Sequence, residues 1–174
     1  MNLLMLINTA GLDYDDRLRK EVLSLQERGV QVQIVALEYN NRADERIVYG
    51  HTSALTIHLR FRNWFPRSRA LLVKTIEMYW KFSLQILKHK PQILWVHNLE
   101  MFGLMPVLIL MRKIGFVKRL IWDQHELPSD SMLASRAYMS LYRMLVNLCD
   151  MVVMANEERR DLILKKVRIT KPVQ

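Results

Sequence analysis

The segment LIWDQHE, residues 120–126, places three titratable side chains directly after an apolar run. An imidazole accepts or donates a proton near neutral pH, and a carboxylate accepts hydrogen bonds from substrate hydroxyls. Asp123, His125 and Glu126 therefore offer acid–base chemistry or a binding site for a hydroxylated ligand. We expect His125 and Glu126 to line a cleft and Asp123 to hold the loop backbone. We expect no metal site, because the segment holds one imidazole and no cysteine, and zinc sites usually need more such ligands.

A second polar cluster follows the apolar run QILWV. His97 comes directly after this run, with Asn98 and Glu100 beyond it. A neutral imidazole at the end of a strand can take the proton of a reacting hydroxyl or hydrogen-bond a substrate. A structural hydrogen bond to a neighbouring loop is the alternative, and His97 alone does not decide between the two.

The third polar stretch is NTAGLDYDD, which follows the first apolar run of the chain. Its single glycine, Gly11, excludes the G-x-G-x-x-G dinucleotide fingerprint, and its aspartates would repel a phosphate. Asp15 or Asp16 is expected to cap the next helix. A contact between Asp13 and a hydroxyl of a sugar or acceptor is the alternative use of these carboxylates.

Apolar runs that alternate with helical patterns must position the three clusters. Strands are expected at residues 2–7, 30–37, 55–61, 92–97, 118–123 and 151–155, and helices at 16–28, 66–88, 100–112, 129–148 and 157–166. Because parallel strands need helical crossovers, this order predicts an α/β class, a Rossmann-like open parallel sheet with helices on both faces. Ligands of such sheets bind beyond the carboxyl ends of the strands, so the three clusters are predicted to gather at one edge.

The long helix predicted at 66–88 has two faces. Its solvent face is expected to carry Lys74, Glu77, Lys81 and Lys88, and its core face Leu72, Ile76, Tyr79, Trp80 and Leu87. The basic stretch before it, RFRNWFPRSR, combines aromatic rings with arginines, as in segments that lie on anionic membranes. The predicted membrane-surface residues are Arg62, Trp64, Phe65, Arg67 and Arg69. A solvated helix face with buried aromatic rings is the alternative.

The composition bounds the class of protein. The chain has 174 residues, of which 51% are apolar and 25% charged, so it is long enough and apolar enough to bury a core. The net charge is +9, concentrated in residues 60–90, and no nucleic-acid motif accompanies it, so a nucleic-acid partner is not expected. The single cysteine, Cys149, is expected to pack in the core. The longest apolar run, residues 101–111, is shorter than the roughly 20 residues of a transmembrane helix.

Four segments, in this order, resemble the N-terminal domain of glycosyltransferase family 4, which adopts the GT-B fold. They are DDRLRKEVLSLQERGVQVQIVAL, QILWVHNLEM, IWDQHEL and LCDMVVMANEERRDLI. IWDQHEL is similar to the family's Tyr-Asp-x-His-Glu-Leu segment, with Trp122 in the aromatic position. The resemblance covers nearly the whole chain.

The resemblance implies a retaining enzyme, usually without a metal and without a cofactor, that moves a sugar from a nucleotide-sugar donor to a glycan or lipid-linked acceptor. Its N-terminal domain mainly holds the acceptor. His97 is implied as the catalytic residue that contacts or deprotonates the acceptor hydroxyl. The implied acceptor-binding residues are Gly11, Asp13, Asp16, Asn98, Glu100, His125 and Glu126.

Residues 1–166 are expected to form this domain, and residues 167–174 to begin the connection to a donor-binding domain. The pair of glutamates that marks the family's donor-binding half has no counterpart in the sequence, so the chain is expected to be a fragment that is inactive alone. Its expected location is the cytoplasmic face of an anionic membrane, in cell-surface polysaccharide or glycolipid assembly. The alternative is a non-catalytic subunit that recruits a separately encoded donor-binding chain to the membrane.

Overall fold

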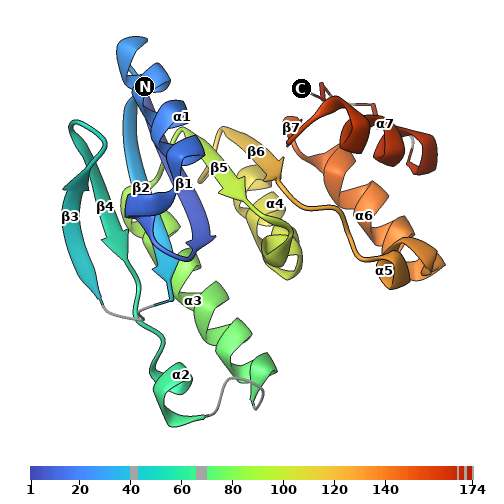
Figure 1. Cartoon of the computed structure of the whole chain (residues 1–174), viewed down its shortest axis with the longest axis horizontal. Helices are drawn as coiled ribbons and strands as arrows, with labels where there is room; N and C mark the ends of the chain where they lie inside the picture. The colour runs from blue at the N-terminus through green and yellow to red at the C-terminus, as the bar shows by residue number, and fades with distance from the viewer. Residues whose placement is uncertain (40–42, 66–69, 168, 171, 174) are drawn as a thin grey trace. The chain divides into compact units, whose positions relative to one another are not determined.

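The computed structural model describes residues 1–39, 43–65, 70–167, 169–170 and 172–173. It divides the chain into two compact units, residues 1–92 and 93–174. In both units parallel strands alternate with helices (Figure 1). The predicted α/β, Rossmann-like class is therefore confirmed.

Among its described residues, the first unit contains four strands in the order β3-β4-β2-β1. The strands are β1 (Asn2–Thr9), β2 (Gln31–Glu38), β3 (Asp44–Val48) and β4 (Thr52–Thr56). β1, β2 and β4 are parallel, and β3 runs antiparallel to β4 at the edge. β1 and β2 are the continuous apolar runs expected of strands that are buried on both faces.

The sequence prediction was wrong at the edge of this unit. The expected strand at 55–61 lies earlier, because β4 ends at Thr56 and α2 (Arg60–Trp64) begins four residues later. β3, DERIV, has no counterpart among the predicted strands. It is an edge strand with exposed charges and only Val48 buried, and such strands lack an apolar run.

Helix α1 (Asp16–Glu27) buries Leu18 and Val22 and is followed by Gly29, whose φ of 73° is left-handed, as expected of a glycine after a helix. The Asp15 carboxylate caps the helix, because its Oδ1 accepts a hydrogen bond from the Leu18 amide at 3.0 Å. The predicted helix at this position and its aspartate cap are confirmed.

Helix α3 (Leu71–His89) presents to solvent most of the side that was predicted to face the core. Trp80 is 65% exposed and Leu72 73%, whereas Glu77 is only 8% exposed. The core face is formed by Met78, Phe82 and Ile86, together with the buried Lys74 and Glu77. Of the predicted solvent face, Lys88 is exposed and Lys81 is intermediate.

Glu77 is buried because it binds the start of α2. Its carboxylate accepts hydrogen bonds from the backbone amides of Arg60 at 2.7 Å and Phe61 at 3.0 Å, and pairs with Lys81 at 3.0 Å. The first amides of a helix lack partners within the helix, so a buried carboxylate is a suitable acceptor. This contact decides which side of α3 faces inward.

In the part of the second unit that the structure describes, three parallel strands lie in the order β5-β6-β7. They are β5 (Ile93–His97), β6 (Arg119–Gln124) and β7 (Met151–Met154), and all three were predicted within two residues at each end. The helices are α4 (Met105–Lys113), α5 (Asp130–Ala134), α6 (Arg136–Leu148) and α7 (Glu157–Lys166). The single helix predicted at 129–148 is divided, because Ser135 adopts an extended conformation and caps α6 at the Tyr138 amide.

Two sets of hydrogen bonds hold parts of the second unit together. The Asp150 carboxylate accepts hydrogen bonds from Nε and Nη2 of Arg112 and from the Leu120 amide, which ties α4 to the start of β6. The Val152 amide donates to the Pro172 carbonyl at 3.1 Å. The predicted domain division at residue 167 stays a prediction. Cys149 is buried, as expected, and burial raises the pKa of its thiol to about 12.

Within the described ranges, none of the helices combines the length and the apolar character needed to cross a membrane.

Replacing Glu77 tests the contact that orients α3. Burial by itself raises the pKa of Glu77, but the hydrogen bonds from Arg60, Phe61 and Lys81 outweigh it and lower the pKa below its ordinary value. The stabilisation is therefore present above the ordinary glutamate pKa and is lost as the pH falls through the lowered folded-state pKa. We expect Glu77→Gln to reduce the free energy of unfolding at pH 7 by about 1.5–3 kcal/mol in urea denaturation.

The control is Glu27→Gln, which changes an exposed glutamate of α1. It should alter stability by less than about 0.5 kcal/mol. Equal effects of the two substitutions, or a loss at Glu77 that does not shrink at low pH, would contradict the assignment.

Candidate functional site

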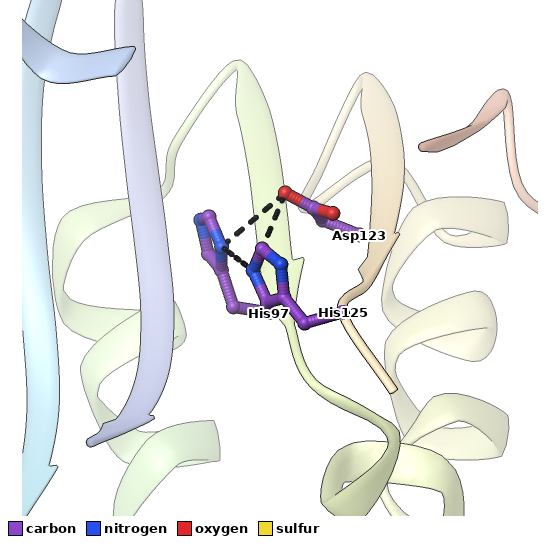
Figure 2. A group of neighbouring side chains, drawn as sticks. All are labelled: His97, Asp123 and His125. Atoms are coloured by element: carbon purple, nitrogen blue, oxygen red, sulfur yellow. Dashed lines mark hydrogen bonds and ion pairs between the residues drawn. The ribbon is translucent and has the colours of Figure 1, made fainter. Parts of the chain in front are cut away.

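Three titratable side chains meet at the carboxyl ends of β5 and β6 (Figure 2). The register pairs His97 with Asp123, so their side chains project from the same face of the sheet. His125 lies two residues beyond Asp123 and returns to that face, because side chains alternate along an extended chain. We name these three residues the His–Asp–His cluster.

The cluster is compact and largely buried. His97 Nδ1 lies 3.4 Å from Asp123 Oδ2 and 3.4 Å from His125 Nε2, and His125 Nε2 lies 3.7 Å from Asp123 Oδ2. The side chains of His97 and Asp123 are 1% and 0% exposed, whereas that of His125 is 23% exposed. A ligand would therefore meet His125 first, with Asp123 behind both rings.

Aromatic rings hold the cluster in place. The Trp95 and His97 rings are stacked with 5.7 Å between centroids, and the His125 ring continues the stack at 5.6 Å from His97. The indole N–H of Trp95 donates to Asp123 Oδ2 at 3.3 Å. These contacts fix the planes of both imidazoles, which is what a positioned acid–base or ligand-binding group requires.

Asn98 follows the cluster in a strained conformation. Its φ of 74° and ψ of 151° lie in a region that residues other than glycine rarely occupy. The Asn98 amide donates to the Asp123 carbonyl at 2.9 Å, and its own carbonyl accepts from the Trp122 indole at 3.3 Å. Strain that neighbouring hydrogen bonds maintain is typical of binding loops.

The structure corrects the sequence interpretation of Asp123. Its backbone carbonyl does hold the neighbouring loop, through Asn98, but its carboxylate contacts the two imidazoles. The argument against a metal ion counted only the imidazole of His125, and the structure brings His97 to the same place; the expectation of no metal site stays a prediction. Glu100 and Glu126 are exposed, so their predicted acceptor contacts remain predictions.

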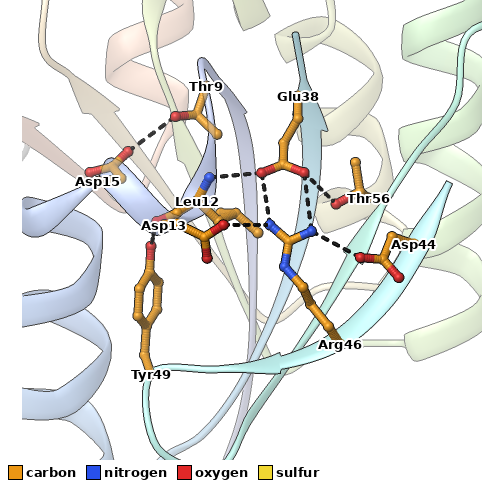
Figure 3. Close-up of polar contacts among 9 residues, drawn as sticks. All are labelled: Thr9, Leu12, Asp13, Asp15, Glu38, Asp44, Arg46, Tyr49 and Thr56. Atoms are coloured by element: carbon orange, nitrogen blue, oxygen red, sulfur yellow. Dashed lines mark hydrogen bonds and ion pairs between the residues drawn. The ribbon is translucent and has the colours of Figure 1, made fainter. Parts of the chain in front are cut away.

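In the first unit, a buried glutamate organises the loop after β1 (Figure 3). Glu38, at the end of β2, is 2% exposed. It accepts hydrogen bonds from the Leu12 amide at 2.8 Å, from Arg46 at 2.9 Å and from Thr56 at 3.1 Å. The Tyr49 hydroxyl donates to the Leu12 carbonyl. Leu12 is thus held on both sides, and we name this set the Glu38 network.

The pKa values of Glu38 and Tyr49 in the Glu38 network differ from their ordinary values. Burial by itself raises the pKa of Glu38, but hydrogen bonds from Leu12, Arg46 and Thr56 outweigh it and lower the pKa. Burial and the nearby aspartates Asp15 and Asp13 raise the pKa of Tyr49 to about 12. At neutral pH the carboxylate is therefore charged and the phenol is protonated, as the hydrogen bonds require.

Three predicted acceptor-binding residues lie on this loop. Asp13 is 73% exposed and lies 3.6 Å from Arg46, and Asp16 is 76% exposed and pairs with Arg19 at 2.9 Å. The φ of Gly11 is 178°, an extended conformation that any residue adopts, and an added Cβ would lie 3.3 Å from the Tyr14 ring. The predicted meeting of this loop with His97 and His125 joins the two units and stays a prediction.

Sequence reasoning missed Glu38, Arg46 and Tyr49. A signal was available for Glu38, because it is a charged residue directly after an apolar run, as Asp123 is. Arg46 and Tyr49 come from the stretch that was interpreted as a polar loop. The pairing of β3 with β4 brings Arg46 to Glu38, and Tyr49, directly after β3, reaches the Leu12 carbonyl.

The predicted membrane-surface residues are described in part. Trp64 and Phe65 are 74% and 40% exposed at the end of α2. Arg62 is turned toward β2 instead, since it donates to the Glu38 carbonyl at 3.1 Å and lies over the Tyr39 ring. Arg67 and Arg69 lie outside the described residues.

Removing the cation of the Glu38 network should loosen the loop after β1. We expect Arg46→Gln to lower the free energy of unfolding by about 1–3 kcal/mol, because a buried carboxylate loses its charged partner. Amide exchange at Leu12 should also become faster. The matched control is Arg19→Gln, which breaks the exposed pair with Asp16 and should change stability by less than about 0.5 kcal/mol. Equal stability of the two variants, with Leu12 exchange unchanged, would refute this role of Arg46.

Comparison with solved structures finds proteins with a similar fold. A sucrose-phosphate synthase from Thermosynechococcus elongatus superposes with a TM-score of 0.69 at 11% identity, over 100% of this chain and 47% of that one. An alpha,alpha-trehalose-phosphate synthase (UDP-forming) from Burkholderia vietnamiensis gives 0.63 at 12% identity, over 95% of this chain and 42% of that one. A trehalose-6-phosphate synthase studied for glycosyltransfer with retention gives 0.59 at 14% identity, over 93% and 42%.

These likenesses show a shared fold, and the chain spans less than half the length of each of the three proteins. No curated protein sequence matches the chain significantly. The sequence profile described as Glycosyltransferase Family 4 matches residues 19–174, which is most of the chain. The chain therefore belongs to glycosyltransferase family 4, with the Rossmann-like fold of a GT-B domain.

Proposed function

We propose that this domain binds the acceptor for a glycosyltransferase that moves a sugar from a nucleotide-sugar to a hydroxyl of a glycan or lipid-linked acceptor. The observation that carries the proposal is the His–Asp–His cluster, which lies at the carboxyl ends of β5 and β6 in a family 4 domain. Ligands of open α/β sheets bind at this edge.

His97 is proposed as the residue that contacts the acceptor hydroxyl. Its Nδ1 faces the Asp123 carboxylate at 3.4 Å, so the carboxylate orients the ring and stabilises positive charge on it. Nε2, on the other side of the ring, is then the atom that can accept the hydroxyl proton. His125 and Glu126 are proposed to shape the same site, with Asn98 and Glu100 at its border.

Transfer is proposed to require a second, donor-binding domain. The sucrose-phosphate synthase and the trehalose-phosphate synthase that this chain resembles are about twice its length, and the second is described as UDP-forming. Retention at the anomeric carbon is proposed by analogy with the trehalose-6-phosphate synthase studied for that outcome. No cofactor is proposed beyond the nucleotide-sugar, which is the donor substrate.

The domain is further proposed to lie on the cytoplasmic face of an anionic membrane. Helix α3 exposes one apolar stripe with residues three or four positions apart, formed by Leu72, Ile76, Trp80, Leu84 and Leu87. Helix α2, which carries the exposed Trp64, lies beside α3 (Figure 1). Residues 60–90 have eight basic residues and one acidic residue in the sequence, and of the basic residues that the structure describes, Arg60, Lys88 and Lys90 are exposed on or beside these two helices.

This surface also favours a second candidate function, a non-catalytic subunit that brings a separate donor-binding chain to the membrane. Co-purification separates the two. A stable complex with a separately encoded nucleotide-sugar-binding chain supports the subunit, whereas a donor domain that continues in the same reading frame supports the enzyme.

A transfer assay tests the proposed reaction. With labelled nucleotide-sugars and a lipid-linked acceptor fraction, the chain alone should show no transfer, and the enzyme completed by its donor-binding domain should show it. In that enzyme His97→Ala should lower kcat/KM by about 10²–10⁴-fold, because a positioned acid–base group is removed. His51→Ala is the control, since His51 lies on the exposed turn between β3 and β4. Turnover by the isolated chain, or a fully active His97→Ala enzyme, would overturn the proposal.

Vesicle sedimentation tests the membrane surface. The chain should bind anionic vesicles more tightly than neutral ones, and less tightly as salt rises, because salt screens charges beyond about 10 Å at 0.1 M. Trp80→Ser should weaken binding about tenfold, through the loss of roughly 1.5 kcal/mol of apolar burial.

Leu110→Ser is the matched control, because Leu110 of α4 is exposed to a similar degree, 57% against 65% for Trp80. Binding that ignores lipid charge, or that both substitutions weaken equally, would remove the membrane proposal.

A further inference from the structure

Arg62 differs from three other arginines described near the carboxyl edge of the first unit. Arg17 and Arg19 pair with acids of their own helix at 2.8 and 2.9 Å, and Arg46 pairs with Glu38 at 2.9 Å. Arg62 contacts a backbone carbonyl and an aromatic ring, and it forms no ion pair with any residue that the structure describes. Its positive charge is therefore not compensated within the described part of the chain.

Two neutral groups hold the Arg62 guanidinium at the end of β2. Its Nη1 donates to the Glu38 carbonyl at 3.1 Å, and its Cζ lies 5.7 Å from the centroid of the Tyr39 ring. The carbonyl takes one of the five N–H groups of the guanidinium. A ring below the guanidinium leaves its edge available, so the remaining donors keep the fork geometry that binds a phosphate through two hydrogen bonds.

Helix α2 carries Arg62 to this position. The amides of Arg60 and Phe61, which begin the helix, donate to the Glu77 carboxylate, and none of the helix residues is buried. Figure 1 shows α2 beyond the arrowheads of β2 and β4, and ligands of parallel sheets bind beyond these carboxyl ends. Polar contacts rather than core packing therefore place Arg62 at the ligand edge of the first unit.

The acids of the Glu38 network have a different cationic partner. The Glu38 carboxylate pairs with Arg46 at 2.9 Å. Asp13 and Asp44 lie 3.6 and 3.0 Å from the same guanidinium. Three carboxylates thus share one arginine, and their excess negative charge repels an anion from the loop after β1. The anionic part of a ligand at this edge is therefore favoured at Arg62, and its uncharged hydroxyl groups at the acidic loop.

The same helix leads to aromatic residues of the proposed membrane surface. Trp64, its last residue, is 74% exposed, and Phe65, which follows it, is 40% exposed. Where a phosphate links a lipid to a sugar, it lies between the two, at the interface of membrane and water. A phosphate is thus the anion that a ligand reaching from this surface to the sheet edge presents to Arg62.

We propose that Arg62 binds the phosphate or diphosphate group of a lipid-linked acceptor. This inference rests on the proposed acceptor-binding function and narrows it, because the acceptor is then an anionic, phosphate-bearing lipid rather than a neutral glycan. Arg62 determines specificity in this role and takes no part in proton transfer. Its guanidinium forms two hydrogen bonds with phosphate oxygens, while the Glu38 carbonyl and the Tyr39 ring keep it in place.

Arginine side-chain NMR tests the site in the wild-type chain of 174 residues, with inorganic pyrophosphate as the probe. At constant ionic strength, the Nε–H signal of Arg62 should shift and saturate as pyrophosphate is added, because its guanidinium forms new charge-assisted hydrogen bonds. The Arg17 signal is the internal reference, since Arg17 already pairs with Glu21. Chloride in place of pyrophosphate should shift neither signal. An unchanged Arg62 signal, or equal shifts at Arg62 and Arg17, would overturn the proposal.

Vesicle sedimentation separates an acceptor phosphate from the head groups of bulk lipid. One set of neutral phosphatidylcholine vesicles carries a long-chain prenyl diphosphate, and a second set carries phosphatidylglycerol at the same surface charge. Arg62→Gln should weaken binding to the diphosphate vesicles about 10–100-fold, through the loss of hydrogen bonds to a charged group. Binding to the phosphatidylglycerol vesicles should weaken about fivefold at most, the effect of one charge near an anionic surface. Equal losses in the two sets would assign Arg62 to the membrane surface and overturn the proposal.

Two further variants control the vesicle result. Arg62→Lys keeps the charge but loses the planar fork, so binding to the diphosphate vesicles should still weaken about tenfold. Arg17→Gln removes a paired arginine near the same edge and should leave the preference for diphosphate vesicles unchanged. Circular dichroism checks that each variant is folded. The same loss of preference in Arg17→Gln as in Arg62→Gln would contradict the assignment.

Transfer by the enzyme completed with its donor-binding domain distinguishes this inference from the proposed function. Arg62→Gln should raise KM for a phosphate-linked acceptor about 10–100-fold with little change in kcat, and should leave KM for the same sugar without the phosphate unchanged. Absence of transfer by the wild type would refute the proposed function, and the NMR and vesicle results would then decide the role of Arg62. Transfer in which Arg62→Gln affects both acceptors equally would refute the role of Arg62 alone.

Discussion

The buried carboxylate of Asp123 is the group on which the site of the second unit depends. A charge removed from water must be paired or hydrogen-bonded, and an unpartnered one is strongly destabilising. Asp123 meets this demand with the imidazoles of His97 and His125 and the indole of Trp95. The same requirement that keeps the fold stable therefore sets the positions of the two histidines.

The first unit also contains a buried carboxylate that must be paired, that of Glu38. Both carboxylates lie at or beside the carboxyl end of a parallel strand, the edge at which α/β proteins bind ligands. The partners of the Glu38 carboxylate are the Leu12 amide and the Arg46 guanidinium. The hydrogen bond from Leu12 fixes the loop after β1. In both units a buried acid at a strand end holds the neighbouring loop, which gives each candidate binding surface a rigid base.

The sequence predicts the α/β class because the central strands are continuous apolar runs, and it predicts each polar cluster because charge follows those runs. The sequence patterns do not show which strands pair or in which register. The second imidazole reaches Asp123 only through the register of β5 and β6, and Arg46 reaches Glu38 only through an edge strand without an apolar run. Periodicity predicted the helix of α3 but assigned its faces wrongly, because it does not show that Glu77 binds backbone amides of α2 and is buried.

Nitrogen-15 NMR of the imidazole rings tests the central claim, that one carboxylate couples His97 and His125. Spectra of the wild type and of Asp123→Asn would be compared, with His51 as the internal reference, because it lies on an exposed turn of the other unit. The account predicts that the ring-nitrogen signals of both His97 and His125 shift in the variant, while those of His51 do not. Unchanged signals for either His97 or His125 would contradict it.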